Sequence, residues 1–179
     1  MFGELQSMID YLSDNNSAYI DKVIVASMGR SGSTLLANVI NCENKYRILF
    51  EPFYPDQVRE TQEFVYPFYL KPDNNDPKYF IPAQMIMEGR IHSPWIDQEL
   101  SRMSSKHLLI KDIRINFFLK WLSNRFQGLK IVLLMRHPCA VVQSWLTCNF
   151  GDGTVARQRI LSEVDLLENF VPESIQKEY

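Results

Sequence analysis

The sequence predicts an α/β fold, namely a three-layer α/β/α arrangement around a mainly parallel central sheet. Short apolar runs rich in β-branched residues alternate along the chain with segments of helical periodicity. Strands that alternate with helices imply crossover connections, and such sheets are covered on both faces. The length of 179 residues, with 46% hydrophobic and 22% charged, suits one domain over residues 1–179.

The first half of the chain is predicted to contain two helices, two strands and an insertion. The expected elements are an amphipathic helix on Phe2, Leu5, Ile9 and Leu12, a buried strand over 23–26, a helix over 34–40 and a strand over 46–50 that ends before Pro52. Residues 55–82 carry several prolines and many aromatics. They predict a long, partly irregular insertion over the edge of the sheet.

The second half continues the alternation. Ser93-Pro94 predicts a helix start, because serine caps helices and proline suits the first helical position. The expected elements are that helix to about Met103, a strand over 107–113, a helix from Asn116 to Gly128, a strand over 130–135, a helix from Pro138 and a last amphipathic helix from Thr154. The run over 130–135 is the most apolar and predicts the most clearly buried strand.

Composition excludes several classes of function. The net charge of −2 gives no general attraction to nucleic acid or to an anionic membrane. No run of about 18 apolar residues predicts a membrane span, and no secretory signal begins the chain. The cysteines Cys42, Cys139 and Cys148 lack zinc-site spacing and indicate reduced thiols. We expect a cytoplasmic enzyme; a Golgi-type enzyme without its anchor is the alternative.

A glycine-serine loop follows the first predicted strand. In parallel sheets, ligands bind beyond the carboxyl ends of the strands. Gly29 and Gly32 permit a tight turn, and the helix behind the loop offers free N–H groups and a partial positive charge. Arg30 adds a fixed charge, and the three hydroxyl residues Ser31, Ser33 and Thr34 add donors. The loop therefore predicts a phosphate or sulfate site; a turn without a ligand is the alternative.

The loop differs from the nucleoside-triphosphate motif G-x-x-x-x-G-K-[ST]. When Gly32 is aligned with the second glycine of that motif, Ser27 replaces the first glycine and Ser33 replaces the lysine. The missing lysine normally reaches the β- and γ-phosphates. An ATPase or GTPase is therefore disfavoured, and a P-loop kinase of a small molecule remains as an alternative enzyme.

A second anion cluster follows the strand over 130–135. Arg136 lies at the carboxyl end of that strand, Pro138 begins a helix, and Ser144 lies about two turns into it. A guanidinium and a hydroxyl that converge beside a helix start form a phosphate site. The alternative is an arginine paired with a surface carboxylate and a serine facing water.

The two motifs together resemble those of the sulfotransferase family. The segment Gly29-Arg30-Ser31-Gly32-Ser33-Thr34-Leu35-Leu36 resembles the 5′-phosphosulfate loop of the carbohydrate and bacterial branches, and Arg136 and Ser144 have the eight-residue spacing of the 3′-phosphate motif. The resemblance covers roughly residues 21–148. It implies a P-loop-like fold and the donor 3′-phosphoadenosine 5′-phosphosulfate. The implied donor-binding residues are Arg30, Ser31, Gly32, Ser33, Thr34, Arg136 and Ser144.

The catalytic base is expected to be Glu51, which follows the second strand at the same edge. Phe50-Glu51-Pro52 resembles a Phe-Glu-Pro segment of carbohydrate sulfotransferases, where an acidic residue is proposed to act. The apolar neighbours Phe50 and Phe53 would raise the pKa of Glu51. The alternatives are that Glu51 only pairs with an arginine, or that a histidine is the base. The three histidines are His92, His107 and His137.

Three further residues are expected to contact the substrate or the donor, namely Lys111, Arg114 and His137. The alternative is that Lys111 and Arg114 face solvent. Arg30 would stabilise the leaving group, and the scheme needs no metal. The acceptor is expected to be a carbohydrate or small metabolite. Family members continue well beyond the second motif, so the resemblance implies a form without the C-terminal part. A nucleotide-binding module without catalysis is the non-enzyme alternative.

Overall fold

The molecule has the α/β fold that the sequence predicts. The computed structural model describes residues 19–65, 68–99, 103–148 and Gln158. Within them, four strands form one parallel sheet in the order β2-β3-β1-β4. The strands are β1 (Asp21–Ser27), β2 (Tyr46–Phe50), β3 (His107–Asp112) and β4 (Lys130–Leu134). The helices are α2 (Ser33–Ile40), α3 (Pro77–Met87), α4 (Leu119–Arg125) and α5 (Pro138–Thr147), with single-turn 3₁₀ helices η1 (Arg59–Thr61) and η2 (Asn116–Phe118).

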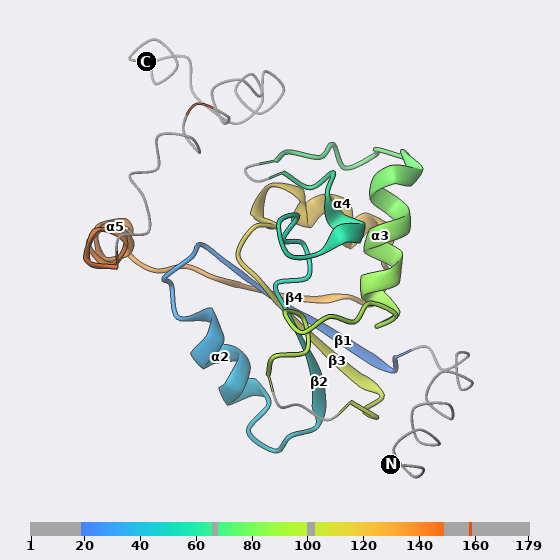
Figure 1. The fold of residues 1–179 in the computed structure, drawn as a ribbon, viewed down its shortest axis with the longest axis horizontal. Helices are drawn as coiled ribbons and strands as arrows, with labels where there is room; N and C mark the ends of the chain where they lie inside the picture. Colours follow the sequence, from blue (N-terminus) through green and yellow to red (C-terminus); the bar gives the residue numbers. More distant parts are fainter. Residues whose placement is uncertain (1–18, 66–67, 100–102, 149–157, 159–179) are drawn as a thin grey trace.

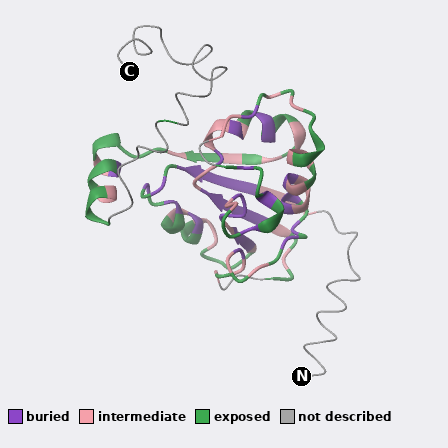
Figure 2. Ribbon diagram, turned by 45° about the horizontal axis from the view of Figure 1, so that its top comes forward, coloured by how far each residue is buried: buried purple, intermediate pink, exposed green. Residues whose placement is uncertain are grey.

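Helices flank both faces of the sheet (Figure 1). Successive residues of a strand point to opposite faces, and β1 divides its side chains accordingly. Val23 and Val25 pack in a cluster with Ala37 of α2. Ile24 and Ala26 pack on the other face, in a larger cluster that includes side chains of α3 and α4. Strands β1, β2 and β3 are mostly buried, as Figure 2 shows.

The prediction that the strand over 130–135 is clearly buried is wrong. This strand, β4, lies at the edge of the sheet, and most of its residues are exposed or half-buried. Val132 is 37% exposed and Leu133 is 53% exposed. The apolar sequence could not distinguish an edge strand from a central one. Helix α5 follows β4 at Pro138, as predicted, and lies apart from the other helices (Figure 1).

The predicted irregular insertion contains a helix that the prolines concealed. Helix α3 begins inside the segment 55–82 and has Pro82 in its interior. Its start has the same signal as Ser93-Pro94, because Asp76 accepts a hydrogen bond from the Lys78 amide and Pro77 occupies the first turn. The prediction did not use that signal and treated the prolines of the segment as evidence of irregular structure.

The helix predicted from Ser93 is absent from residues 93–99, which form turns instead. Ser93 does cap one turn, since its hydroxyl accepts from the Ile96 amide at 3.1 Å. The segment contains one hydrogen bond of the helical type, from the Asp97 amide to the Ser93 carbonyl at 3.0 Å, and is otherwise held by tertiary contacts. The fully buried Arg47 donates to the Ile91 carbonyl and pairs with Asp97, and the Ile96 carbonyl accepts from the Phe50 amide.

The remaining predicted elements agree in place, with two qualifications. Asn116 begins the one-turn helix η2 rather than capping a long helix, because its side chain donates to the Ser27 and Ile113 carbonyls. Helix α4 follows it and ends before Gly128. The helices predicted around Phe2 and after Thr154 lie outside the described residues.

Candidate functional site: the carboxyl edge of the sheet

The glycine-serine loop joins β1 to α2. Gly32 is the N-cap of α2 and has a left-handed φ of 96°, and Arg30 is also left-handed at 69°. Such a backbone is uncommon for a residue with a side chain and often marks a functional turn. Because the cap is glycine, no side chain occupies the first N–H groups of α2. The start of α2 therefore leaves backbone donors and a partial positive charge for an anion.

Two carbonyl groups of the loop are turned toward α5. The Trp145 indole donates to the Gly29 carbonyl at 3.1 Å, and Arg136 Nη1 donates to the Arg30 carbonyl at 2.9 Å. In a trans peptide the N–H points opposite to the preceding carbonyl. The amides of Arg30 and Ser31 therefore point away from α5, and the Ser31 amide donates to the Met28 carbonyl at 3.3 Å. The Arg30 amide and the two carbonyl groups thus face different sides of the loop.

A buried hydroxyl in the loop has no partner among the described residues. Ser31 is only 9% exposed, and its Oγ makes no hydrogen bond there. Buried polar groups are normally satisfied, because an unpaired one costs about 1–3 kcal/mol. Ser33, two residues on, is buried, and Thr34 is exposed. The unsatisfied hydroxyl of Ser31 fits a ligand oxygen at this loop.

The two clusters predicted from sequence meet in the structure. Arg30 Nε donates to Ser144 Oγ at 3.1 Å, and Arg30 Nη2 lies 3.1 Å from Cys148 Sγ. Arg136 also contacts Arg30, because its guanidinium donates to the Arg30 backbone carbonyl. Within the described part of the chain, neither guanidinium forms an ion pair with a carboxylate. Two exposed guanidinium groups without a carboxylate partner in this part of the chain, one of them bonded to the Ser144 hydroxyl, favour an anionic ligand.

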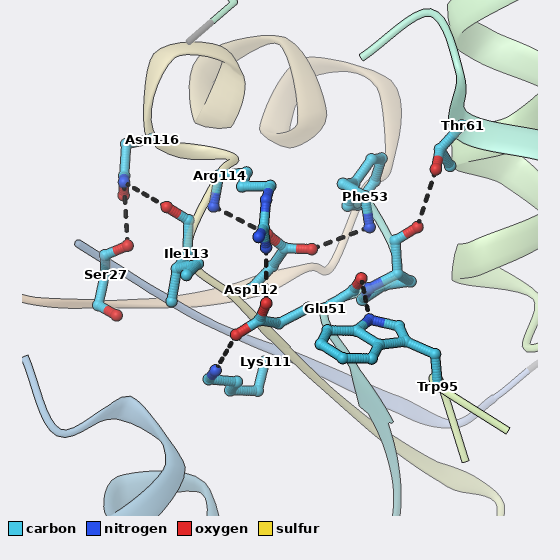
Figure 3. Close-up of polar contacts among 11 residues, drawn as sticks. Ser27, Glu51, Phe53, Thr61, Trp95, Lys111, Asp112, Ile113, Arg114 and Asn116 are labelled. Carbon is cyan, nitrogen blue, oxygen red and sulfur yellow. Dashed lines mark hydrogen bonds and ion pairs between the residues drawn. The ribbon is translucent and has the colours of Figure 1, made fainter. Parts of the chain in front are cut away.

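Glu51 lies at the same edge of the sheet, next to cations (Figure 3). Its carboxylate forms ion pairs with Lys111 Nζ and, at 2.6 Å, with Arg114 Nη1. Glu51 is 5% exposed and Lys111 is 4% exposed. Glu51 is therefore buried, but it contacts two positive charges as well as apolar neighbours. The contact with Arg114 is of the kind given by the alternative that Glu51 pairs with an arginine. The alternative that Lys111 faces solvent is wrong, because its ammonium is buried over the Phe50 ring.

Asp112 is a titratable residue of this edge that the sequence analysis did not select. Burial raises the pKa of Asp112 to about 6, against the hydrogen bonds from the Phe53 and Arg114 amides that lower it. Its two oxygens therefore hold the loops after β2 and β3 together. Its position directly after Lys111 at a strand end was the available signal. Glu51 itself has a left-handed φ of 43°, which places its carboxylate between the two loops.

The three histidines differ in their positions and in their contacts. His107 begins β3 and pairs in register with Asp21, so it lies at the opposite edge of the sheet. His92 contacts Asp97 and the buried Arg47. His137 is exposed at the start of α5, beside Arg136. No histidine among the described residues is hydrogen-bonded to the Glu51 cluster.

Comparison with known proteins identifies no relative: no family model, no curated protein and no solved structure matches this chain. No helix in the described residues has the length and apolar character to cross a membrane. In the same residues, no group of three histidine, cysteine or acidic side chains is arranged to hold a metal ion. The carboxyl edge of the sheet carries the glycine-serine loop, the arginines Arg30 and Arg136, and a buried glutamate flanked by cations.

Proposed function

We propose that the protein is a sulfotransferase that moves a sulfuryl group from 3′-phosphoadenosine 5′-phosphosulfate to a hydroxyl of a carbohydrate or small metabolite. One observation carries the proposal: the glycine-serine loop and the strand-end arginine, separated by more than a hundred residues, contact each other through Arg30, Arg136 and Ser144. A donor with phosphates at both ends of its ribose needs two adjacent anion sites. A nucleotide with one phosphate chain needs only the loop.

The residues of the loop fit the 5′ end of such a donor. The uncapped start of α2 offers N–H groups, and the unsatisfied Ser31 hydroxyl offers a further donor. Gly32 allows the backbone to approach an anion closely, since it has no side chain. The Arg136 guanidinium and the Ser144 hydroxyl provide the donors for a 3′-phosphate.

Once bound, the donor supplies the sulfuryl group and departs as adenosine 3′,5′-bisphosphate. An acceptor oxygen forms the new bond to sulfur while the bond from sulfur to the phosphate oxygen breaks. Glu51 takes the acceptor proton in this scheme, because each of its oxygens keeps a lone pair beside its ion pair. Lys111 and Arg114 orient the carboxylate and stabilise nearby negative charge. His137 lies beside Arg136 as a further donor contact.

The proposal is tested by calorimetric titration with adenosine 3′,5′-bisphosphate and with 5′-AMP at fixed ionic strength. We expect the bisphosphate to bind much more tightly than 5′-AMP. Arg136→Ala should weaken binding of the bisphosphate by about 1.5–3 kcal/mol, the range for a hydrogen bond to a charged group, and leave that of 5′-AMP unchanged. Equal affinity of the wild type for both ligands would overturn the proposal.

Two further arms separate the alternatives. Magnesium-dependent binding of ATP, tighter than that of the bisphosphate, would favour a small-molecule kinase. Transfer of sulfate from the radiolabelled donor to any hydroxyl acceptor in a panel of sugars and phenols would exclude a module without catalysis. Lys45→Gln is a matched control for charge, because Lys45 is an exposed lysine paired with Glu43.

A further inference from the structure

The side chain of Arg30 points toward α5. The sequence assigned this arginine to the 5′ end of the donor, together with the rest of its loop. In the structure its Nε and Nη2 atoms contact Ser144 and Cys148, both at the C-terminal half of α5. The left-handed backbone at Arg30 reverses the chain at this point. Arg30 is thus a loop residue whose guanidinium belongs spatially to the second cluster.

Arg30 also bridges the two residues expected to bind one phosphate. Arg136 and Ser144 are eight residues apart, and most of a helix lies between them. Arg136 Nη1 reaches the carbonyl of Arg30, whereas Ser144 Oγ reaches its Nε atom. A phosphate that contacts both Arg136 and Ser144 therefore lies against Arg30 as well.

The charges favour the same arrangement. Arg136 is held at the Arg30 carbonyl, and no carboxylate of the described residues neutralises Arg30 or Arg136. A phosphate dianion bound by both guanidinium groups would supply the counter-charge. It would also accept from donors that now make only exposed hydrogen bonds to a neutral hydroxyl and a thiol.

We infer that Arg30 binds the 3′-phosphate of the donor with Arg136 and Ser144, while the α2 N–H groups and loop hydroxyls bind the 5′ end without it. The inference rests on the proposed function. It makes Arg30 a residue that selects nucleotides with a 3′-phosphate. The 5′ loop then recognises its anion through backbone and hydroxyl donors.

The test uses Arg30→Gln and three ligands, namely adenosine 3′,5′-bisphosphate, 3′-AMP and 5′-AMP, titrated calorimetrically at one salt concentration. Glutamine keeps a polar side chain of similar reach and bears the same left-handed backbone cost as arginine. We expect the bisphosphate and 3′-AMP to bind at least about tenfold more weakly to the variant, since a charged hydrogen bond is lost. Binding of 5′-AMP should change by less than about twofold.

A coupling measurement gives a second readout. Ser144→Ala should weaken the same two ligands, and the double variant should lose less than the two single losses combined, because the side chains act on one phosphate. Arg30→Lys, which keeps the charge, should restore part of the affinity. Arg90→Gln is the matched control, since it removes one charge from an exposed arginine paired with Glu88.

Two outcomes overturn the inference and are distinguishable. Equal loss of 5′-AMP and bisphosphate in Arg30→Gln would return Arg30 to the 5′ end while the proposed function stands. No preference of the wild type for the bisphosphate over 5′-AMP would remove the 3′-phosphate site and the proposed function together. The wild-type titrations alone reveal the second outcome.

Discussion

At the scale of single residues, Glu51 is the residue whose surroundings constrain its role most. A buried carboxylate costs free energy unless it is paired, and Glu51 has two cationic partners. Its left-handed backbone adds a local cost that the neighbouring loops must offset. The same cluster therefore serves both the stability of the edge and the proposed chemistry.

Glu51→Gln should abolish sulfuryl transfer and retain binding of the bisphosphate. It should also lower the free energy of unfolding by about 3 kcal/mol, because Lys111 and Arg114 lose their counter-charge. Urea unfolding measures the second effect, and a radiolabelled transfer assay the first, at a temperature where the variant is folded. Glu88→Gln breaks an exposed ion pair and should cost less than about 1 kcal/mol. Persisting transfer would show that another group is the base.

At the scale of elements, hydrogen bonds to the glycine-serine loop help to position α5. This helix follows the exposed edge strand β4, and its outer residues Val142 and Leu146 are 51% and 67% exposed. The bonds from Trp145 to Gly29 and between Arg30 and Ser144 join it to the loop. These bonds therefore contribute to the position of α5 relative to the glycine-serine loop.

Trp145→Phe removes the indole donor and keeps an aromatic ring in place. We expect bisphosphate binding to weaken by roughly fivefold, which corresponds to the loss of one hydrogen bond of about 1 kcal/mol. Calorimetry measures the change. Trp121→Phe is the control, because Trp121 donates to the Asn74 carbonyl on the α4 side of the sheet. Unchanged affinity in Trp145→Phe would mean that the other contacts fix α5 without this bond.

At the scale of the whole molecule, local sequence patterns predicted the helices and strands better than the contacts between them. The strands and α2 follow from apolar runs and turn residues, and these were placed correctly. Two of the failures came from long-range contacts: Arg47 holds residues 93–99 in turns, and the edge position exposes β4. The third, the missed helix α3, came from the prolines of its own segment. The pairing of Glu51 with Lys111 depends on the register of β2 and β3, which no local pattern encodes.

The pH dependence of global stability is a prediction at this scale. The pKa of Asp112 is raised to about 6 in the folded protein, mainly by burial, from its ordinary value of 3.8. The folded state therefore binds this proton more tightly than the unfolded state. The contribution of Asp112 to stability should fall as pH rises from about 4 to about 6, by on the order of 3 kcal/mol, and then remain constant.

Urea unfolding of the wild type and of Asp112→Asn between pH 4 and pH 7 isolates this contribution. The difference between their unfolding free energies should change across that interval, since asparagine does not titrate. Acidic groups remote from Asp112 contribute equally to both proteins and cancel in the comparison, whereas the interaction between Asp112 and Glu51 is part of the measured difference. A difference that is independent of pH would contradict the raised pKa of Asp112.

The order of the strands has a consequence for how the chain is made. β1 lies between β3 and β4, so its first hydrogen-bonded neighbour begins only at His107. A ribosome adding roughly 5–20 residues per second exposes β1 for several seconds before that neighbour exists. During synthesis the apolar residues of β1 have no sheet to join. The nascent chain should therefore be a client of chaperones until β3 emerges from the ribosomal tunnel.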